Sequence, residues 1–461
     1  MQRYVYWCFL LCVVAVVGCS DEHRSTPTTP DPSQSDFADP QALANALIDE
    51  AGWTEGGSTN AIPQRMGGVI PLFHFERTPI VDDVVHYSVQ MRVGPGPYDR
   101  IGLHRVVREQ RPYQPIRTDR TLFLVHGDLK DFTGMFLPGQ FSPNRPNDFG
   151  VAAFLAENDV DVWGIDQGWN FVPQEEANFA FFADWGLQKE VDNLAVGVSV
   201  AQLVRLATGN GHGKMNLLGY SSGGMTGYAL LNQEAQRPPV LRKVGGYIAA
   251  DMGVRSDDPL WLEFWQGWVA IYESLHQGGQ YEDPLIFREA SLLARSNPDD
   301  ASPFFDGFTN LEVALFFAGG PVYAPTVAHY HAPILEDEFP VDLQFVTVPQ
   351  WLDFLEDTAA YQPILFALDW YRIAAGLDSP FTDHLSSIDI PVFDLGAAGG
   401  IGPYTSATVS YLGSNDITQL YVSTGASDQA LDFGHIDLFT AENSPELVWT
   451  PILDWVAAHS D

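Results

Sequence analysis

The sequence predicts an α/β fold in which a mostly parallel central sheet is flanked by helices, with a helical lid inserted before the last two strands. Short, continuous apolar runs alternate with amphipathic helical stretches over residues 121–249, which is typical of buried parallel strands joined by helices. This rhythm stops over residues 252–387 and returns over residues 388–461. In addition, 46% of the 461 residues are hydrophobic, which supplies ample apolar surface for one large globular body.

The N-terminus has the pattern of an export signal over residues 1–18. Arg3 precedes an apolar run over residues 4–17 that is too short for a comfortable transmembrane helix. The run ends in Val-Val-Gly before Cys19, which resembles the lipobox of bacterial lipoproteins. The resemblance implies cleavage before Cys19 and lipidation of its sulfur and amine, and the alternative is a plain secretory signal.

The cysteines bear on location and on chemistry. They are Cys8, Cys12 and Cys19, so cleavage would leave one cysteine, at the anchor. The folded body then contains no disulfide, no cysteine-ligated metal and no cysteine nucleophile. Residues 19–40 are rich in Ser, Thr, Pro and Asp and predict a flexible tether. We therefore expect an exported protein, lipid-anchored to a bacterial membrane at the outer-membrane, periplasmic or cell-surface face.

The charge balance excludes some partners. Lys and Arg number 23 against 59 Asp and Glu, a formal net charge of −36. Such a surface repels phosphate backbones, so we expect no nucleic-acid partner. It also argues against electrostatic attraction to anionic lipids, which leaves the lipid anchor as the expected membrane contact. The sequence leaves the oligomeric state open.

The predicted core comprises residues 41–251 and 388–461, interrupted by the inserted residues 252–387. Its first elements are two strands joined by a Gly-Pro-Gly-Pro turn. A helix beginning at Ser444-Pro445 ends the chain, with Ser444 as the expected N-cap. The expected strands are residues 84–93, 101–107, 121–125, 160–165, 215–218, 244–249, 390–395 and 417–423, and the expected core helices are 186–207, 228–235 and 445–458.

A Gly-x-Ser-x-Gly motif lies at residues 219–223, directly after one predicted strand and before a predicted helix. On such a tight turn a serine hydroxyl is exposed, the glycines let strand and helix approach, and the helix N-terminus stabilises developing negative charge. Ser221 is therefore the candidate nucleophile. Ser222 does not fit the motif, because Tyr220 would then occupy the first glycine position. The alternative is a Gly/Ser turn used only for packing.

The strand over residues 121–125 ends in a His-Gly pair, which places backbone N–H groups beside the nucleophile turn. The expected oxyanion hole consists of the N–H groups of Ser222 and Asp128, with Leu129 as an alternative to Asp128. An acidic side chain at Asp128 would oppose an oxyanion unless it points away. His126 is a rival for the catalytic base, although we expect it to shape the loop.

His435 lies in the loop between the last predicted strand and the last predicted helix. This late place in the chain suits a general base for Ser221. The alternative is a loop histidine that merely contacts a carboxylate. His329 and His331 could ligate a metal, but no third ligand is evident, so we expect neither a metal nor a cofactor.

Taken in order, the strand ending in His-Gly, the Ser221 motif and the Gly-His435 loop resemble the α/β-hydrolase superfamily. The tail over residues 434–445 looks most like the acid-lipase/esterase branch of that superfamily. The resemblance covers roughly residues 80–251 and 388–461. It implies the α/β-hydrolase fold, a serine nucleophile and a histidine base held by a carboxylate.

This chain differs from the acid-lipase/esterase branch at the acid of the triad. In that branch the acid follows the strand before the last, in a Gly-Gly-x-Asp-like turn, but residues 391–402 of this chain have no acid at that position. The superfamily has another position, at the end of the strand after the nucleophile helix, where this chain has Asp251. Asp251 is therefore the expected acid and Asp394 the main alternative, with Asp428 and Asp432 after it. Asp251 could instead be a strand-end cap.

The inserted residues 252–387 lie where α/β-hydrolases often carry a lid, and they are rich in Phe, Trp and Tyr. An aromatic roof over Ser221 predicts an apolar or aromatic acyl substrate. The sequence thus predicts a lipase-like or esterase-like serine hydrolase that acts on a small-molecule or lipid ester. Two alternatives stay open: a thioesterase, amidase or acyltransferase using the same triad, and a surface-anchored, non-catalytic binding protein on a hydrolase scaffold.

Overall fold

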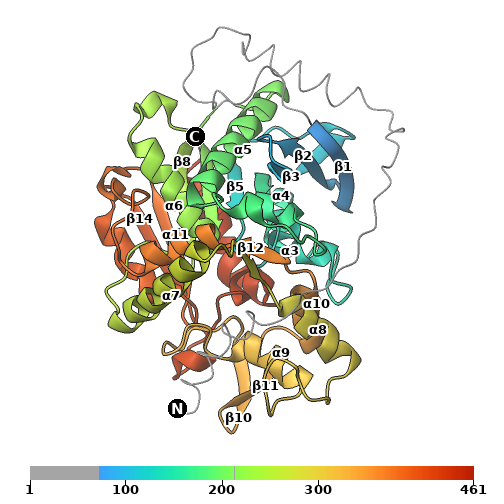
Figure 1. The fold of residues 1–461 in the computed structure, drawn as a ribbon. Coiled ribbons are helices and arrows are strands. Elements are labelled where there is room, and N and C mark those ends of the chain that lie inside the picture. The colour runs from blue at the N-terminus through green and yellow to red at the C-terminus, as the bar shows by residue number, and fades with distance from the viewer. Residues whose placement is uncertain (1–71, 212, 461) are drawn as a thin grey trace.

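The computed structural model describes residues 72–211 and 213–460 (Figure 1). The predicted signal, the tether and Cys19 lie outside these residues, so their assignment stays a prediction. No helix in the described part of the chain is long and apolar enough to cross a membrane.

The described residues form one ten-stranded sheet, which is mostly parallel. Its parallel strands are β5 (Thr121–Val125), β6 (Asp161–Asp166), β7 (Met215–Tyr220), β8 (Val244–Ala250), β13 (Val392–Ala397) and β14 (Ile417–Val422). Its antiparallel strands are β1 (Leu72–Val81), β2 (Val84–Arg92), β3 (Arg100–Arg111) and β4 (Gln114–Pro115). The order is β1-β2-β3-β6-β5-β7-β8-β13-β14, with β4 paired to β3. The predicted sheet is confirmed, and β1 and β4 extend it.

Strand β5 shows why the parallel strands are continuous apolar runs. Leu122 and Leu124 pack into one hydrophobic core, and Phe123 and Val125 pack into the other. Successive side chains of a strand point to opposite faces, so a strand with a core on each side must be apolar throughout.

Helices cover both faces of the sheet (Figure 1). One face packs against α3 (Phe132–Phe136), α4 (Val151–Glu157) and α14 (Thr450–Ala458), and the other against α5 (Leu187–Ala207) and α6 (Ser222–Ala235). Two short helices, α12 (Gly402–Thr405) and α13 (Asp437–Thr440), lie in the loops after β13 and β14. This is the predicted α/β class.

The start of the last helix differs from the expectation. A π-helical turn over Pro445–Trp449 precedes α14, and Ser444 itself has helical dihedral angles without capping it. The Ser444 hydroxyl instead donates to the backbone oxygen of Asp437. Its N-cap assignment was therefore wrong, because the side chain is used to hold the preceding turn.

The inserted segment, residues 252–387, is mainly helical, as predicted. Two small sheets accompany its helices, although the sequence there shows no strand rhythm. The strands are too short for a periodic pattern to emerge. The elements are α7 (Pro259–Gln277), β9 (Glu282–Pro284), α8 (Phe287–Ser296), α9 (Asn310–Gly319), β10 (Pro333–Glu336), β11 (Phe339–Leu343), α10 (Val348–Glu356), β12 (Tyr361–Pro363) and α11 (Ile364–Ala374). The role of this segment as a lid stays a prediction.

Candidate active site

Ser221 lies on the sharp turn between β7 and α6, with φ 57° and ψ −129°. A positive φ is costly for any residue but glycine, so this turn is held by its surroundings. The flanking glycines show how tight it is. A Cβ at Gly219 would lie 2.4 Å from the oxygen of Gly223, and a Cβ at Gly223 would lie 2.4 Å from the oxygen of His126. The motif thus reflects close contact between strand and helix.

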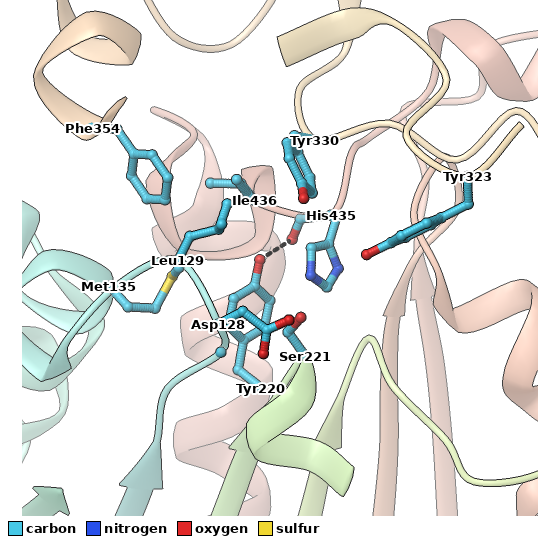
Figure 2. Close-up of a pocket in the computed structure, with 11 residues that line it drawn as sticks. Asp128, Leu129, Met135, Tyr220, Ser221, Tyr323, Tyr330, Phe354, His435 and Ile436 are labelled. Atoms are coloured by element: carbon cyan, nitrogen blue, oxygen red, sulfur yellow. Dashed lines mark hydrogen bonds between the residues drawn. The ribbon is translucent and has the colours of Figure 1, made fainter. Parts of the chain in front are cut away.

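His435 and Ser221 line the same pocket, and Figure 2 shows the imidazole beside the serine side chain. His435 follows β14, in the loop before α13, and is almost fully buried. Its Nδ1 is hydrogen-bonded to Oδ2 of Asp251 at 2.6 Å. A proton held on Nδ1 leaves Nε2 as the basic nitrogen, which is the tautomer that a serine nucleophile needs.

Asp251 follows directly on β8, is fully buried and has a φ of 50°. Besides the imidazole, its carboxylate accepts hydrogen bonds from the backbone N–H groups of Ala397 (2.8 Å), Ile401 (2.9 Å) and Gly402 (2.7 Å). A Cβ at Gly400 would lie 2.2 Å from Oδ2 of this carboxylate. The glycine-rich turn after β13 therefore carries no acid of its own, and its backbone binds one from the neighbouring strand.

The alternative acids are held elsewhere. Asp394 is bonded to two side chains of β14, and burial raises its pKa. Asp428 accepts a backbone N–H at the start of a short helical turn, and Asp432 is bonded to its own loop. Among the described residues, the structure brings Asp251 and none of these three into hydrogen-bond contact with His435.

The two expected oxyanion-hole residues both border the nucleophile. Ser222 is the first residue of α6, and Asp128 follows Gly127, at which a Cβ would lie 2.7 Å from the Cβ of Ser221. The Asp128 side chain does not point away from the pocket but enters it beside Ser221 (Figure 2). An ionised carboxylate at this place would repel the oxyanion. Burial raises the pKa of its carboxyl, and the neighbouring Ser222 and Gln362 side chains and the charge of His435 partly offset this.

His126 lies behind the pocket rather than in its lining. Its Nδ1 donates to the oxygen of Gly127 at 2.7 Å, and its Nε2 accepts the backbone N–H of Gln167 at 3.1 Å. Burial lowers its pKa to about 4, so the ring is neutral at pH 7. These contacts fit the expected loop-shaping role.

Tyr220 is a site residue that sequence reasoning missed. Its hydroxyl donates to the backbone oxygen of His435 at 3.1 Å, and its ring stacks on the imidazole with centroids 4.7 Å apart. Tyr220 occupies the variable position before the motif serine, where no pattern predicts a partner for a distant histidine.

The inserted segment also supports the His435 loop. The N–H of His435 donates to the oxygen of His329 at 2.9 Å, and His331 is bonded to the Asp437 carboxylate at 2.6 Å. The same carboxylate accepts the N–H of Gly434 at 2.8 Å. His329 and His331 thus bind loop atoms, and no group of three or more His, Cys, Asp or Glu able to hold a metal occurs in residues 72–211 and 213–460.

The pocket above Ser221 is small, with a volume of about 20 Å³, room for about one water molecule. Three aromatic residues of the inserted segment, Tyr323, Tyr330 and Phe354, form part of its wall (Figure 2). The other lining residues are Gly127, Asp128, Leu129, Met135, Tyr220, Ser221, His435 and Ile436.

Comparisons with known proteins bear on the fold. No protein-family model matches the sequence, and no curated protein does. A solved structure of a candidate lipase from Sulfolobus solfataricus is 18% identical, with a TM-score of 0.56 over 84% of this chain and 99% of that one. A soluble variant of the monoglyceride lipase from Saccharomyces cerevisiae is 12% identical, with a TM-score of 0.43 over 87% of this chain and 99% of that one. The likeness to the Sulfolobus structure and the mostly parallel sheet flanked by helices show that this chain has the α/β-hydrolase fold.

Proposed function

We propose that the protein is a serine hydrolase that cleaves carboxylic esters. One observation carries the proposal: Ser221, on its strained turn, shares a pocket with His435, whose Nδ1 is bonded to the buried carboxylate of Asp251. A nucleophile, a base and a carboxylate that orients the base are the groups that acyl transfer through serine requires.

In the first half of the reaction, Ser221 Oγ attacks the ester carbonyl carbon while its proton passes to Nε2 of His435. Asp251 keeps the other proton on Nδ1 and stabilises the imidazolium. The N–H groups of Asp128 and Ser222 donate to the oxyanion of the tetrahedral intermediate. The intermediate then collapses, the imidazolium protonates the leaving alkoxide, and an alcohol departs from the acyl-enzyme.

In the second half, His435 takes a proton from a water molecule, whose oxygen attacks the acyl carbon. A second tetrahedral intermediate forms in the same oxyanion hole. Its collapse breaks the bond to Ser221 Oγ, which regains its proton from the imidazolium, and releases the carboxylic acid. Every group in this scheme belongs to the chain, to the ester or to water.

The substrate proposal rests on the aromatic wall that Tyr323, Tyr330 and Phe354 give to the pocket. Such a wall favours an apolar or aromatic acyl group, as in a small-molecule or lipid ester. The description of the Sulfolobus structure as a candidate lipase fits this proposal. Turnover of p-nitrophenyl esters of increasing chain length would measure the preferred acyl group.

A fluorophosphonate probe, which phosphonylates activated serines, tests the proposal directly. We expect the wild type to be labelled and Ser221→Ala to stay unlabelled. Ser410→Ala is the matched control, because this exposed hydroxyl bonds only its own turn, and it should label like the wild type. An unlabelled wild type, or equal labelling of Ser221→Ala, would favour the non-catalytic binding protein instead.

We also propose that the chain is exported and lipid-anchored through Cys19, on the strength of the sequence Val-Val-Gly-Cys. Full-length protein made in a Gram-negative host with an alkyne fatty acid should acquire the label and fractionate with membranes. Cys19→Ala should lose the label, whereas Cys12→Ala, which lies in the expected signal, should keep it. Labelled Cys19→Ala protein would disprove the anchor.

A further inference from the structure

The pocket contains a charged side chain that the proposed reaction does not need. Asp128 contributes its backbone N–H to the scheme, yet its carboxyl also enters the pocket beside Ser221 (Figure 2). Its Oδ1 is buried and makes no hydrogen bond within the described residues, although the neighbouring Ser222 and Gln362 side chains lower the pKa of the carboxyl. A buried carboxylate oxygen without a partner is costly, so a ligand that supplies one would be bound favourably.

Among the described lining residues there is no Lys or Arg, and His435 is the one side chain able to offset the charge of this carboxyl. Lys130 is near in sequence, but its buried amine donates to the backbone oxygen of Phe354 at 2.7 Å and to Asp357 at 2.9 Å. That amine also lies 4.6 Å from the ring centres of Phe141 and Phe354. The amine of Lys130 is therefore bound by Asp357 and Phe354, and no hydrogen bond joins it to Asp128 within the described residues.

A second carboxyl adds to the negative potential. Asp283, on β9 of the inserted segment, is bonded to the hydroxyl of Tyr272. Burial raises its pKa to about 6, and the charge of Asp128 contributes to the rise. The Asp283 carboxyl thus lies close enough to Asp128 to respond to its charge, and two neighbouring carboxyls favour the entry of a positive group.

The pocket wall suits such a group as well. The hydroxyl ends of Tyr323 and Tyr330 point toward the pocket, and Phe354 adds a third aromatic side chain (Figure 2). The hydroxyl oxygens of the two tyrosines can each turn a lone pair toward a bound ammonium group. In addition, the net charge of −36 raises the concentration of cations around the molecule.

We propose that Asp128 is a specificity-determining residue that selects esters carrying a positive charge close to the scissile bond. The inference rests on the proposed ester hydrolysis. An ionised Asp128 would oppose the oxyanion that forms beside it, and a substrate ammonium group held by the carboxylate would cancel that repulsion. The bound cation would therefore lower the barrier as well as strengthen binding.

The test uses two esters of the same shape that differ by one charge, acetylcholine and 3,3-dimethylbutyl acetate. We expect the wild type to prefer the choline ester by about tenfold or more in kcat/KM, as a charge-assisted contact would give. Asp128→Asn keeps the size of the side chain and the backbone N–H, and should abolish most of this preference. Asp394→Asn, which removes a buried carboxyl outside the pocket, should retain it.

The same ratio is measured for phosphonylation of Ser221 by two phosphonates, one with a choline and one with a 3,3-dimethylbutyl leaving group. This second readout avoids any dependence on acyl length. A wild type that reacts equally with both partners of a pair, or an Asp128→Asn variant that keeps the preference, would overturn the inference and leave ester hydrolysis standing. Ser221-dependent turnover of p-nitrophenyl esters without reaction of any of the four compounds would also overturn the inference, whereas absence of Ser221-dependent reaction with both sets would overturn the proposed function itself.

Discussion

Replacing Asp251 by asparagine is the most informative single change, because all four contacts of its carboxylate are known. Oδ1 accepts the N–H groups of Ala397 and Gly402, and Oδ2 accepts the N–H of Ile401 and Nδ1 of His435. An asparagine NH₂ at the Oδ1 position would leave two backbone N–H groups without an acceptor, whereas at the Oδ2 position it would leave one. The orientation with the NH₂ at the Oδ2 position is therefore favoured.

That orientation reverses the hydrogen bond to the imidazole. The asparagine NH₂ can only donate to Nδ1 of His435, so the proton moves to Nε2, which can then no longer accept the proton of Ser221. Loss of the correct tautomer costs about 10⁴-fold in kcat in a serine triad. The buried N–H of Ile401 also loses its acceptor, which should lower the free energy of unfolding by about 1 to 3 kcal/mol.

The assay is steady-state turnover of a p-nitrophenyl ester, with the free energy of unfolding measured by urea denaturation in parallel. We expect Asp251→Asn to lose about 10⁴-fold in kcat with KM little changed. Asp394→Asn is the control, because its carboxyl contacts β14 side chains and should change kcat by less than about threefold. If Asp394→Asn lost activity by orders of magnitude and Asp251→Asn did not, the assignment of the acid would be refuted.

Two further predictions concern buried charges. The Lys130 side chain is fully buried, whereas that of its partner Asp357 is 44% exposed. Asp357→Ala should lower the free energy of unfolding by about 2 to 3 kcal/mol, because the buried ammonium group loses its bonded carboxylate. Lys130→Met keeps the apolar part of the side chain and should lower the free energy of unfolding, measured in urea, by less than about 1 kcal/mol. A larger loss for Lys130→Met than for Asp357→Ala would contradict this prediction. Burial lowers the pKa of His86 from 6.5 to about 3, so the unfolded chain binds the proton first and stability falls as the pH drops below 6.5. Between pH 6.5 and 4.5, proton uptake by His86 lowers the free energy of unfolding by at most about 3 kcal/mol. His86→Gln still offers His104 a hydrogen bond, and its free energy of unfolding should fall less over this pH range, by that amount. Parallel curves for the two proteins would show that folding does not lower the pKa of His86.

The nucleophile turn could be predicted from the sequence because its requirements are local. Gly219 and Gly223 are needed where strand and helix nearly touch, and both lie within two residues of Ser221. The apolar runs were equally informative, since each strand with a core on both faces must be hydrophobic along its whole length. Local requirements of this kind leave a pattern that can be recognised in one sequence.

The surroundings of His435 and Asp251 left no such pattern. The Asp251 carboxylate is bound by backbone N–H groups within residues 397–402. A backbone contact restricts the residue type only where a side chain would clash, as at Gly400. The contact between Tyr220 and the oxygen of His435 is likewise made across 215 residues of chain. Position within the fold suggested Asp251, but only coordinates show which backbone groups hold it.

The register of three parallel strands explains how these distant residues come to lie together. Ser221 continues β7 and donates its N–H to Ala250, and Asp251 continues β8 and donates its N–H to Leu395 of β13. Adjacent strands lie about 4.8 Å apart, so the nucleophile turn and the acid are placed one strand apart at the same edge of the sheet. Both residues then leave the sheet with a positive φ, 57° at Ser221 and 50° at Asp251. A slip of one residue in either pairing would reverse the side chains at that edge, so the hydrophobic cores that fix the register also fix the geometry of the site.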